Sequence, residues 1–578
     1  MAICSRIKQF HPATRVEGPP QPPSESPRRK RGRPKGSRST PKPVPVRHAK
    51  VFGIHYADHS ELPPALWNLV VSLTLTVFRG LLKVASQLKV EGSGEEQERL
   101  LFRELPQLLY RVVRDLAQWW WSYDRGFLGT RLRCPRCGSD LTYRGDVARS
   151  FVSLFGRLRV DRAYYVCSSR TCDGSLCPLD ERLGLDKDGF LPSVCEVVSW
   201  LTSLDPYGKC LSFIGKLLRF TISHRSAWLI TQRVGAISKS REDEAIENAF
   251  GNPTTPVFPE AEVAPPHTGV VMFDGTCGRV DQDDGEASST QPANDDPDAP
   301  PKTANFREIK VGLAAHLRPP PRKRRPVTVP ESKTVSTKSV RSKHQKVRNP
   351  GEEPTLAHKK LAVQLGPPQR LFQLILLLIY RLGLDKAKVI LAIGDGAHWI
   401  WCGVREHLSS LGATVVEILD YWHAIEHLWQ LANAFFGKGT KQAKAWVRAR
   451  EAQLLKGNLV AFFNALDSLR ERAQKAGNDL VELVDKEITY FRNNEGRIRY
   501  ADYLAKGYLI GSGAMEGSCK HHIKERLDGP GMHWKPSGAM AVLRNRTLIK
   551  NSDWGDFWKA EAINRRLRYE QLKARLAA

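Results

Sequence analysis

Three acidic residues stand in sequence contexts that suit metal-dependent phosphoryl transfer. Asp274 ends the apolar run of VVMFDGT, Asp395 ends that of VILAIGDG, and Glu516 opens a helix-like stretch in GSGAMEGSCKHHIKERL. Mg²⁺ is a hard cation held by a few carboxylates, and two such ions can stabilise the attacking and leaving oxygens of an in-line displacement. Because Asp-Gly is foremost a turn signal, the prediction rests on the arrangement of the three acids together.

The surrounding pattern indicates a sheet with helices that could position these acids. HTGVVMFDG, VILAIGD and TVVEILD are typical of strands, and residues 306–317 are typical of a hairpin partner for the first of them. Residues 357–383 and AHWIWCGVREHLSSL are predicted to be helices, and 422–505 are predicted to be almost wholly helical. Alternating strands and helices specify an α/β sheet, so the sequence predicts an α/β core with a helical insertion before Glu516.

Two further acids compete for roles near this site. Asp420 also ends a strand-like run and, with His423, forms AspTyrTrpHis, in which the His could hydrogen-bond near the acid cluster. A purely structural Asp-His pair fits equally well. Glu308 is a rival acid at a strand position, although a surface carboxylate is the simpler interpretation.

The stretch around Glu516 carries its own signals. Ser512 could cap the helix and leave Glu516 in the first turn. Basic residues recur downstream and could contact phosphates, or could form a solvated face, and these are Lys520, His521, Lys524 and Arg526.

Five of the eleven cysteines crowd into residues 134–177. Cys134 and Cys137 form a turn-sized pair, and Cys167 with Cys172 supplies a second pair after a predicted hairpin. Four thiolates from two turns can close a tetrahedral structural zinc site. The second pair has a wider spacing than usual, so Cys177 is an alternative to Cys172 as the fourth ligand.

Residues 190–251 are typical of a helical segment, with Ser223 as a plausible N-cap for a helix that runs on through Arg233. A helix-turn-helix module would place that second helix in the major groove of DNA, with Arg225 and Arg233 as its candidate contacts. Helix pairs that begin at a Ser are common in any core, so ordinary packing is the alternative.

The N-terminal residues 1–60 are rich in Pro, Ser, Lys and Arg, which predicts a disordered basic tail. Within it, PRRKRGRPKGSRS resembles an AT-hook with the core Arg31, Gly32, Arg33 and Pro34. In such a hook, arginines enter the narrow minor groove of A·T-rich DNA. A generic basic run is the alternative.

The charge of the chain is unevenly placed. The formal net charge is +27, and residues 1–50 hold 13 Lys or Arg against two Glu, while residues 318–350 hold 11 against one. Clustered positive charge predicts a polyanionic partner, because neutralised phosphates release counterions. Solvated tails are the alternative.

The N-terminus lacks the apolar segment of a signal peptide. The longest apolar runs, 66–78 and 371–380, fall short of the ~20 residues that span a bilayer. Local clustering of cysteines suits a reducing compartment. We therefore expect a soluble intracellular protein without a membrane span.

From Cys134 to Trp558 the sequence resembles DDE transposases of the ISKra-type insertion sequences, allied to the Mutator-like superfamily. The motifs that carry the resemblance are CPRCG, RVDRAYYVC, MFDGT, REIKVG, IGDGAHWIW, LDYWHAIEHLW, GSGAMEGSCKHHIKERLDGPGMHW and LRNRTLIKNSDW. The sequence departs from the family pattern in the spacing of Cys167 and Cys172, in its acidic and basic inserts and in its N-terminal hook.

The resemblance implies an RNase H-like core with a helical insertion, preceded by zinc and helix-turn-helix modules. It also implies that Asp274, Asp395 and Glu516 hold Mg²⁺ or Mn²⁺, and that Asp420 and His423 form the acid-x-x-His motif of Mutator-type enzymes. The expected organisation is 1–60 basic tail, 61–128 helical region, 129–189 zinc module, 190–251 helix-turn-helix, 268–421 first part of the core with inserts 279–304 and 318–355, 422–508 helical insertion, and 509–578 final helix and C-terminal region.

These features together predict a transposase that binds the inverted-repeat ends of its element, frees a 3′-OH by hydrolysis and joins it to target DNA. Its partners would be double-stranded DNA and at least one more copy of the chain during synapsis, in the DNA-associated cytoplasm of a prokaryote. A non-catalytic DNA-binding protein, regulatory or architectural, and a cellular nuclease are the alternatives.

Overall fold

The computed structural model describes most of the chain from residue 64 onward. The AT-hook candidate, residues 31–34, and most of both predicted inserts lie outside the described residues. Two compact units, Met1–Trp67 and Asn68–Ala578, divide the chain, and the second holds every element below except the first turn of α1. The described residues are 64–88, 93–217, 220–252, 254–281, 306–319, 354–476, 478–529 and 532–577.

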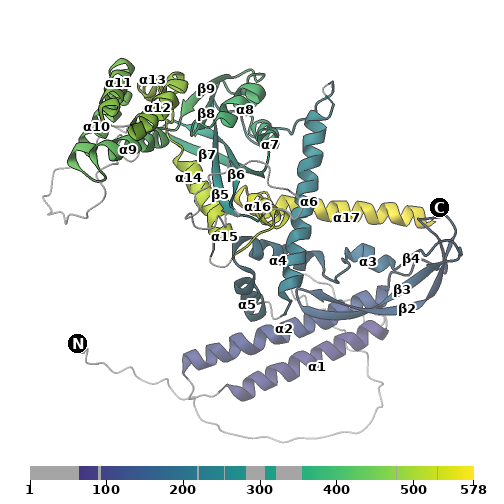
Figure 1. Ribbon diagram of the computed structural model, residues 1–578. Helices are drawn as coiled ribbons and strands as arrows, with labels where there is room; N and C mark the ends of the chain where they lie inside the picture. The colour runs from purple at the N-terminus through teal and green to yellow at the C-terminus, as the bar shows by residue number, and fades with distance from the viewer. Residues whose placement is uncertain are drawn as a thin grey trace, which may run out of the picture. The chain divides into compact units, whose positions relative to one another are not determined.

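A five-stranded mixed sheet forms the centre of the larger core, in the order β7-β6-β5-β8-β9 (Figure 1). The strands β5, β6 and β7 are antiparallel neighbours, whereas β5, β8 and β9 run parallel. The predicted strands and the predicted hairpin are confirmed, except that Asp274 does not end its strand, because β5 pairs with β6 as far as Arg279. The strands are β5 Thr268–Arg279, β6 Phe306–Arg318, β7 Thr355–Leu365, β8 Val389–Gly394 and β9 Thr414–Leu419.

The prediction of one helix over 357–383 is wrong in its first part. Residues 355–365 form β7, which pairs with β6, and the helix α7 begins only at Pro368. Gly366 adopts φ +109, a backbone conformation that favours glycine, and Pro368 occupies the first turn of the helix, where its missing N–H is harmless. The Gly-Pro-Pro sequence therefore marks a boundary between two elements.

Glycines in the sheet show which helices cover each face. A Cβ added at Gly312 would lie 2.5 Å from Ile375 of α7, and the register partner of Gly312 is Phe273. A Cβ at Gly278 would instead contact Leu527. Gly278 is five positions beyond Phe273 in β5, and side chains alternate along a strand, so Gly278 and Phe273 point to opposite faces of the sheet. The helices are α7 Pro368–Arg381 and α8 His398–Leu408 on the Phe273 side, and α14 Gly513–Ser518 and α15 Glu525–Leu527 on the other.

Residues 421–505 are helical, as predicted. Leu428 and Phe462 are among the fully buried side chains of this segment, and they belong to the same hydrophobic core as the sheet. The helices lie between β9 and α14 in the chain, and they are α9 Tyr421–Phe436, α10 Lys441–Leu455, α11 Leu459–Ala476, α12 Asn478–Asn493 and α13 Tyr500–Ala505.

Among the described residues, a smaller antiparallel sheet and the four helices α3 to α6 lie between α2 and the large sheet. The long hairpin β2–β3 is the main part of the small sheet. Ser223 accepts a hydrogen bond from the Ser226 N–H, so the predicted N-cap is confirmed. The elements are β1 Arg131–Arg133, β2 Asp140–Ser153, β3 Gly156–Cys167, β4 Ser175–Leu176, α3 Pro178–Leu183, α4 Pro192–Leu204, α5 Tyr207–Leu217 and α6 His224–Phe250.

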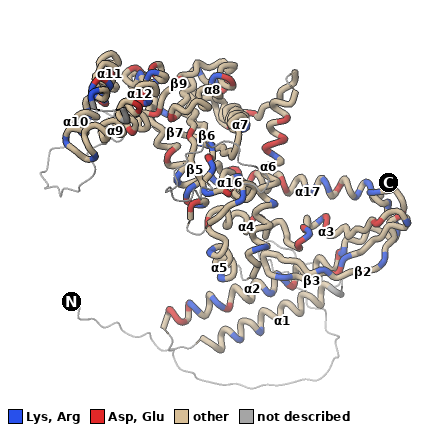
Figure 2. The backbone as a smooth tube through the Cα atoms, in the orientation of Figure 1, with Lys and Arg blue, Asp and Glu red and all other residues tan. Residues whose placement is uncertain are grey.

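Two long helices, α1 (Pro64–Gln87) and α2 (Gly94–Asp124), form the predicted N-terminal helical region. The helix α1 continues past the apolar run 66–78, so it is long and apolar enough to cross a membrane by length and composition alone. The segment Leu66–Gln87 has a mean hydropathy of 1.6, and 6% of its most apolar part is buried. Arg79 and Lys83 are its charged residues (Figure 2). One such helix is weak evidence for a membrane.

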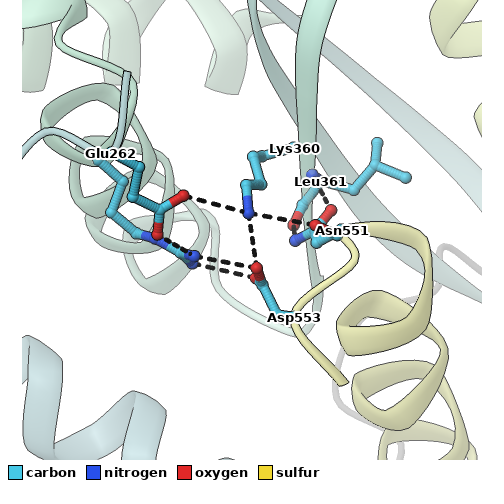
Figure 3. Close-up of polar contacts among 6 residues, drawn as sticks. Glu262, Lys360, Leu361, Asn551 and Asp553 are labelled. Atoms are coloured by element: carbon cyan, nitrogen blue, oxygen red, sulfur yellow. Dashed lines mark hydrogen bonds and ion pairs between the residues drawn. The ribbon is translucent and has the colours of Figure 1, made fainter. Parts of the chain in front are cut away.

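The C-terminal helices α16 (Pro536–Lys550) and α17 (Trp554–Ala577) are joined by a turn that covers the edge strand β7 (Figure 3). The Asn551 side chain donates to the Leu361 carbonyl at 2.9 Å and accepts from the Leu361 N–H at 2.7 Å, so the outward backbone groups of Leu361 on this edge strand are satisfied. Asp553 accepts from Lys360 at 2.6 Å and pairs with Arg381 at 3.0 Å.

Candidate functional site: a row of carboxylates at the end of the sheet

Three aspartates follow the same row of the central sheet. Phe273 of β5 pairs with Gly394 of β8, and Gly394 pairs with Leu419 of β9. The next residues in the chain are Asp274, Asp395 and Asp420. Neighbouring strands lie about 4.8 Å apart, so the sheet brings two predicted metal ligands and the predicted supporting acid into one line.

Asp274 lies on the face of the sheet opposite α7 and α8. Phe273 and Gly394 face α7 and α8, where a Cβ at Gly394 would contact Ile400 at 3.0 Å. Because side chains alternate along a strand, Asp274 points to the opposite face. The Cys519 thiol donates to the Asp274 carboxylate at 3.3 Å there, on the side where α14 and α15 lie.

Glu516 lies in the first turn of the short helix α14, as predicted, and its side chain is exposed. Cys519 follows it by three residues, so the two side chains share one face of the helical stretch. The contact from Cys519 to Asp274 therefore places Glu516 one turn away from the aspartate row. A π-helical turn, Cys519–Lys524, follows α14 directly, and such turns are frequent at functional sites.

Asp420 is buried and holds the segment that leads into α14. Its carboxylate accepts from the Ser512 hydroxyl at 2.6 Å, the Ser512 N–H at 3.1 Å and the Trp422 N–H at 3.2 Å. Ser512 occupies the N-cap position of α14, as predicted, but its side chain forms no cap hydrogen bond because its hydroxyl donates to Asp420 instead. Asp420 therefore fits a positioning role, with its oxygens occupied by hydrogen bonds.

Aromatic and His side chains of the helical insertion close one side of the row. The Tyr490 hydroxyl donates to the Asp395 carbonyl at 2.8 Å, and its ring stacks on His427 with centroids 3.9 Å apart. His423 lies 4.9 Å from His427, ring to ring. Burial raises the pKa of Asp420, against lowering by the hydrogen bonds from Ser512 and Trp422 and by the nearby His423.

Sequence reasoning missed two of these neighbours. Tyr490 lies 95 residues beyond Asp395 inside a long helical segment, and no sequence signal pointed to it. Cys519 could have been found, because its spacing of three from Glu516 places it on the same helix face.

Glu308, the rival acid, lies on the other side of the sheet from Asp274. It pairs in register with Cys277, whereas Asp274 pairs with Val311, and an odd separation along β5 puts the two acids on opposite faces. Its carboxylate forms an ion pair with Lys310 at 2.7 Å. The structure therefore separates Glu308 from the aspartate row.

The aspartate row is electrostatically costly when ionised. Burial raises the pKa of Asp274, and the nearby Asp395 and Asp420 carboxylates raise it further, against lowering by the hydrogen bond from Cys519. Bound divalent cations favour the ionised form of such carboxylates, so the donor set suits Mg²⁺ or Mn²⁺. The acids do not close tightly around one point, because among the described residues only a cysteine group has three or more ligand atoms all within 4.8 Å of one another.

The raised pKa of Asp274 predicts a pH-dependent stability. Protonated Asp274 favours the folded state below the ordinary carboxyl pKa, and this contribution is lost as pH rises through the higher folded pKa. In EDTA we therefore expect Asp274→Asn to gain stability relative to wild type between pH 4 and neutrality, measured by urea unfolding. Asp502→Asn, an exposed control, should show no such trend, and a trend of opposite sign for Asp274→Asn would contradict the assignment.

A second site gathers four sulfurs in the small sheet. Cys134, Cys137, Cys167 and Cys172 have sulfur atoms within 4.8 Å of one another, with separations of 3.9 Å for Cys134–Cys172 and 3.5 Å for Cys137–Cys167. Tetrahedral zinc with Zn–S bonds of ~2.3 Å places sulfurs about 3.8 Å apart. The group therefore fits a structural zinc ion, and it includes Cys172 as the fourth member.

Local structure explains the choice between Cys172 and Cys177. A Cβ at Gly174 would lie 3.2 Å from the sulfurs of both Cys134 and Cys172, so glycine lets the chain pass close to the group. Cys177 follows β4 and is the N-cap residue of α3, outside the group. Hydrogen bonds from Ser139 lower the pKa of Cys137 to about 6, which favours a thiolate in the group.

The zinc assignment predicts a difference between two cysteine variants. Cys172→Ser should lose the zinc ion of the wild type, about one per chain for a four-cysteine structural site, and should unfold at a lower temperature. Cys177→Ser should keep both properties. Elemental analysis and thermal unfolding of the purified proteins measure this, and equal zinc contents in the two variants would contradict the ligand set.

The residues predicted to contact DNA differ in their surroundings. Arg225 on α6, Lys520 and Lys524 are exposed. Arg233 forms ion pairs with Asp186 and Asp188, which occupy the donors that a phosphate would need.

The suggestion that Arg526 contacts phosphate is wrong in this structure, because the side chain is 1% exposed. Its Nε and Nη2 donate to the Thr202 carbonyl at 3.1 and 2.9 Å. Thr202 lies in the last turn of α4, where carbonyl groups lack partners within the helix. Arg526 thus ties the stretch that begins with Glu516 to the end of α4.

Arg546 of α16 strengthens the same junction from a second direction. It is 3% exposed, and it donates to the Ser203 carbonyl at 2.7 Å and to the His522 carbonyl at 2.9 Å. The first of these belongs to α4 and the second to the π-helical turn after Glu516. One buried guanidinium therefore joins the helical module at 192–250 to the candidate catalytic helix.

No protein-family model matches the chain, and a search of curated proteins finds no match. The residues and their geometry are therefore the basis for a proposed function.

Proposed function

We propose that this chain is a DDE-type DNA transposase, similar to those of ISKra-type insertion sequences and allied to Mutator-like enzymes. The observation that carries the proposal is the aspartate row, in which Asp274 lies within β5, Asp395 directly follows the neighbouring parallel strand β8, and Asp274 contacts the helical stretch of Glu516 through Cys519. Function is argued from this site, because a fold alone hosts many activities.

The arrangement of the core supports the same proposal. Three antiparallel strands continue into two parallel ones, and a helical insertion lies between β9 and α14. This order is the one expected of an RNase H-like core with an all-helical insertion. The site then lies beyond the carboxyl ends of parallel strands, where α/β sheets bind ligands.

In the proposed reaction, Asp274 and Asp395 hold divalent metal most directly, and Glu516 completes the ligand set. Bound Mg²⁺ or Mn²⁺ supplies activation of the attacking oxygen and stabilisation of the leaving oxygen. Asp420 positions α14 through Ser512, and Tyr490 fixes the backbone at Asp395. The same residues would serve hydrolysis, which frees a 3′-OH, and joining, in which that hydroxyl attacks target DNA.

The remaining modules would supply DNA binding. We assign double-stranded DNA contacts to the basic tail with Arg31–Pro34, to exposed Arg225 on α6, and to Lys520 and Lys524. Structural zinc would hold the small sheet in shape. Pairing of two DNA ends calls for at least a dimer, and the proposed setting is the nucleoid of a prokaryotic cytoplasm.

A strand-transfer assay tests the proposal. Labelled duplexes copied from the DNA that flanks the coding sequence are incubated with the full chain and Mg²⁺. The proposal predicts metal-dependent nicking followed by joining of the 3′ end to a target plasmid. Nicking without joining would support a cellular nuclease, and tight binding without nicking would reject the enzyme.

One observation favours the non-catalytic DNA-binding alternative. The Cys519 thiol occupies an oxygen of Asp274 at 3.3 Å, on the side where metal would bind. In the enzyme, metal binding must displace this weak donor, so Mg²⁺ should change the reactivity of Cys519 towards a thiol reagent. In a regulatory protein Mg²⁺ should leave that reactivity unchanged.

A further inference from the structure

A cavity of about 470 Å³ lies where the start of α5, the first turns of α6 and the start of α16 meet. Part of its wall comes from the segment MHWK that follows the catalytic helix, a motif that the proposed chemistry does not use. The wall residues that matter for its chemistry are Tyr207, Trp228, Arg526, His533, Trp534 and Ser537.

Aromatic side chains line the cavity. Trp534 is buried and held by a hydrogen bond, whereas Trp228 is exposed. Trp534 is 7% exposed, and its Nε1 donates to the Leu527 carbonyl at 3.2 Å. Arg526 lies over the rings of Trp534 and Tyr207, at 4.7 and 5.5 Å from their centroids. Trp228 is 47% exposed, so its ring is accessible for stacking with a planar ligand.

The polar groups of the cavity favour a ligand that accepts hydrogen bonds and carries negative charge. No Asp or Glu is among its described wall residues, and Arg526 donates to the Thr202 carbonyl and the Met532 thioether. Tyr207 lines the cavity, and its buried hydroxyl has no hydrogen-bond partner among the described residues. A buried hydroxyl without a partner is costly, and a heteroaromatic base offers it one.

We propose that this cavity receives an unpaired nucleobase of bound DNA. Aromatic rings bind bases by stacking, with little dependence on sequence, and enzymes pay least to extrude a base that is already unpaired. Arg526 follows Glu516 by ten residues in a nearly continuous helical stretch, which spans about 15 Å. The cavity would therefore hold a nucleotide close to, and outside, the proposed cleavage site. This inference rests on the proposed function for its DNA partner.

Binding measurements without divalent metal test the inference. The probes are a synthetic duplex that contains one unpaired 2-aminopurine and the same duplex with that base paired. Wild-type protein should bind the unpaired form about tenfold more tightly and quench its fluorescence by stacking. Trp228→Ala should abolish the preference and the quenching while binding the paired duplex normally, whereas Trp120→Ala, on exposed α2, should keep both.

A second variant, which keeps Trp228 but fills the cavity, tests whether the cavity itself is needed. Ser537 is exposed at the cavity, and Ser537→Phe should fill the space and also abolish the preference. Equal wild-type affinities for the two duplexes, or a preference that survives in both variants, would overturn the inference. Failure of the proposed function has a different signature, which is absence of metal-dependent nicking by wild-type protein whatever its preference for unpaired bases.

Discussion

Asp395→Asn is expected to reduce Mg²⁺-dependent DNA cleavage about 10³-fold or more, because a metal ligand supplies several kcal/mol of charge stabilisation and each 1.4 kcal/mol is a factor of ten. Asparagine removes the negative charge and retains the shape. Its side-chain oxygen can still accept from the Ala397 N–H, as Asp395 does at 2.9 Å. Cleavage of labelled duplexes and DNA binding are measured in parallel, and binding should survive.

The control for this variant is Asp502→Asn, a charge-neutralising change at an exposed residue of the helical insertion. It should cleave at the wild-type rate. Cleavage by Asp395→Asn at the wild-type rate would remove Asp395 from the catalytic set.

Asp420→Ala is expected to lower the cleavage rate about 100-fold, since displacements of about 1 Å near a reacting group carry that cost. The change deletes the acceptor of the Ser512 hydroxyl and N–H, and so it releases the segment that sets the position of α14. DNA affinity should remain close to wild type, because neither group is part of the proposed DNA contacts.

A double-mutant cycle distinguishes positioning through Ser512 from a general loss of stability. Ser512→Ala should lower the rate as well, and adding it to Asp420→Ala should cause little further loss, because residues of one hydrogen-bonded network are not additive. Fully multiplied effects in the double variant would show that Asp420 acts by another route. All rates are compared below the unfolding temperature of the least stable variant.

The sequence predicted the existence of the strands better than their alignment. The apolar runs before Asp395 and Asp420 end where β8 and β9 end, whereas β5 continues past Asp274 to Arg279. Nothing in the runs says that Phe273, Gly394 and Leu419 share one row. Register depends on tertiary pairing, and the acids are far apart in the chain. The apolar runs therefore locate the strands, but only the structure shows that the three aspartates lie side by side.

Other errors have specific physical causes. Residues 357–365 have helix-compatible side chains, yet pairing with β6 and the Asn551 side chain make them an edge strand. Tertiary contacts here override local propensity. Ser512 had the right type and place for a cap, but a buried carboxylate offered a stronger partner.

For the cysteine group, the sequence predicted most of the ligands, and the structure was needed only for the fourth. Its first pair was clear from spacing alone, whereas the fourth ligand stayed open between Cys172 and Cys177 until the pairing of β4 with β3 placed Cys177 beyond the group. Sequence spacing limits which sulfurs can meet, and the turn at Gly174 decides which do.

The central claim is that Asp274, Asp395 and Glu516 hold divalent metal together. Anomalous diffraction from crystals of the full chain soaked in Mn²⁺ tests it most directly. Manganese is expected where β8 ends beside Asp274 of β5, within bonding distance of Asp274 and Asp395 and on the side of Glu516, with Cys519 moved off Asp274. Manganese bound only elsewhere, with the Cys519–Asp274 contact intact, would contradict it.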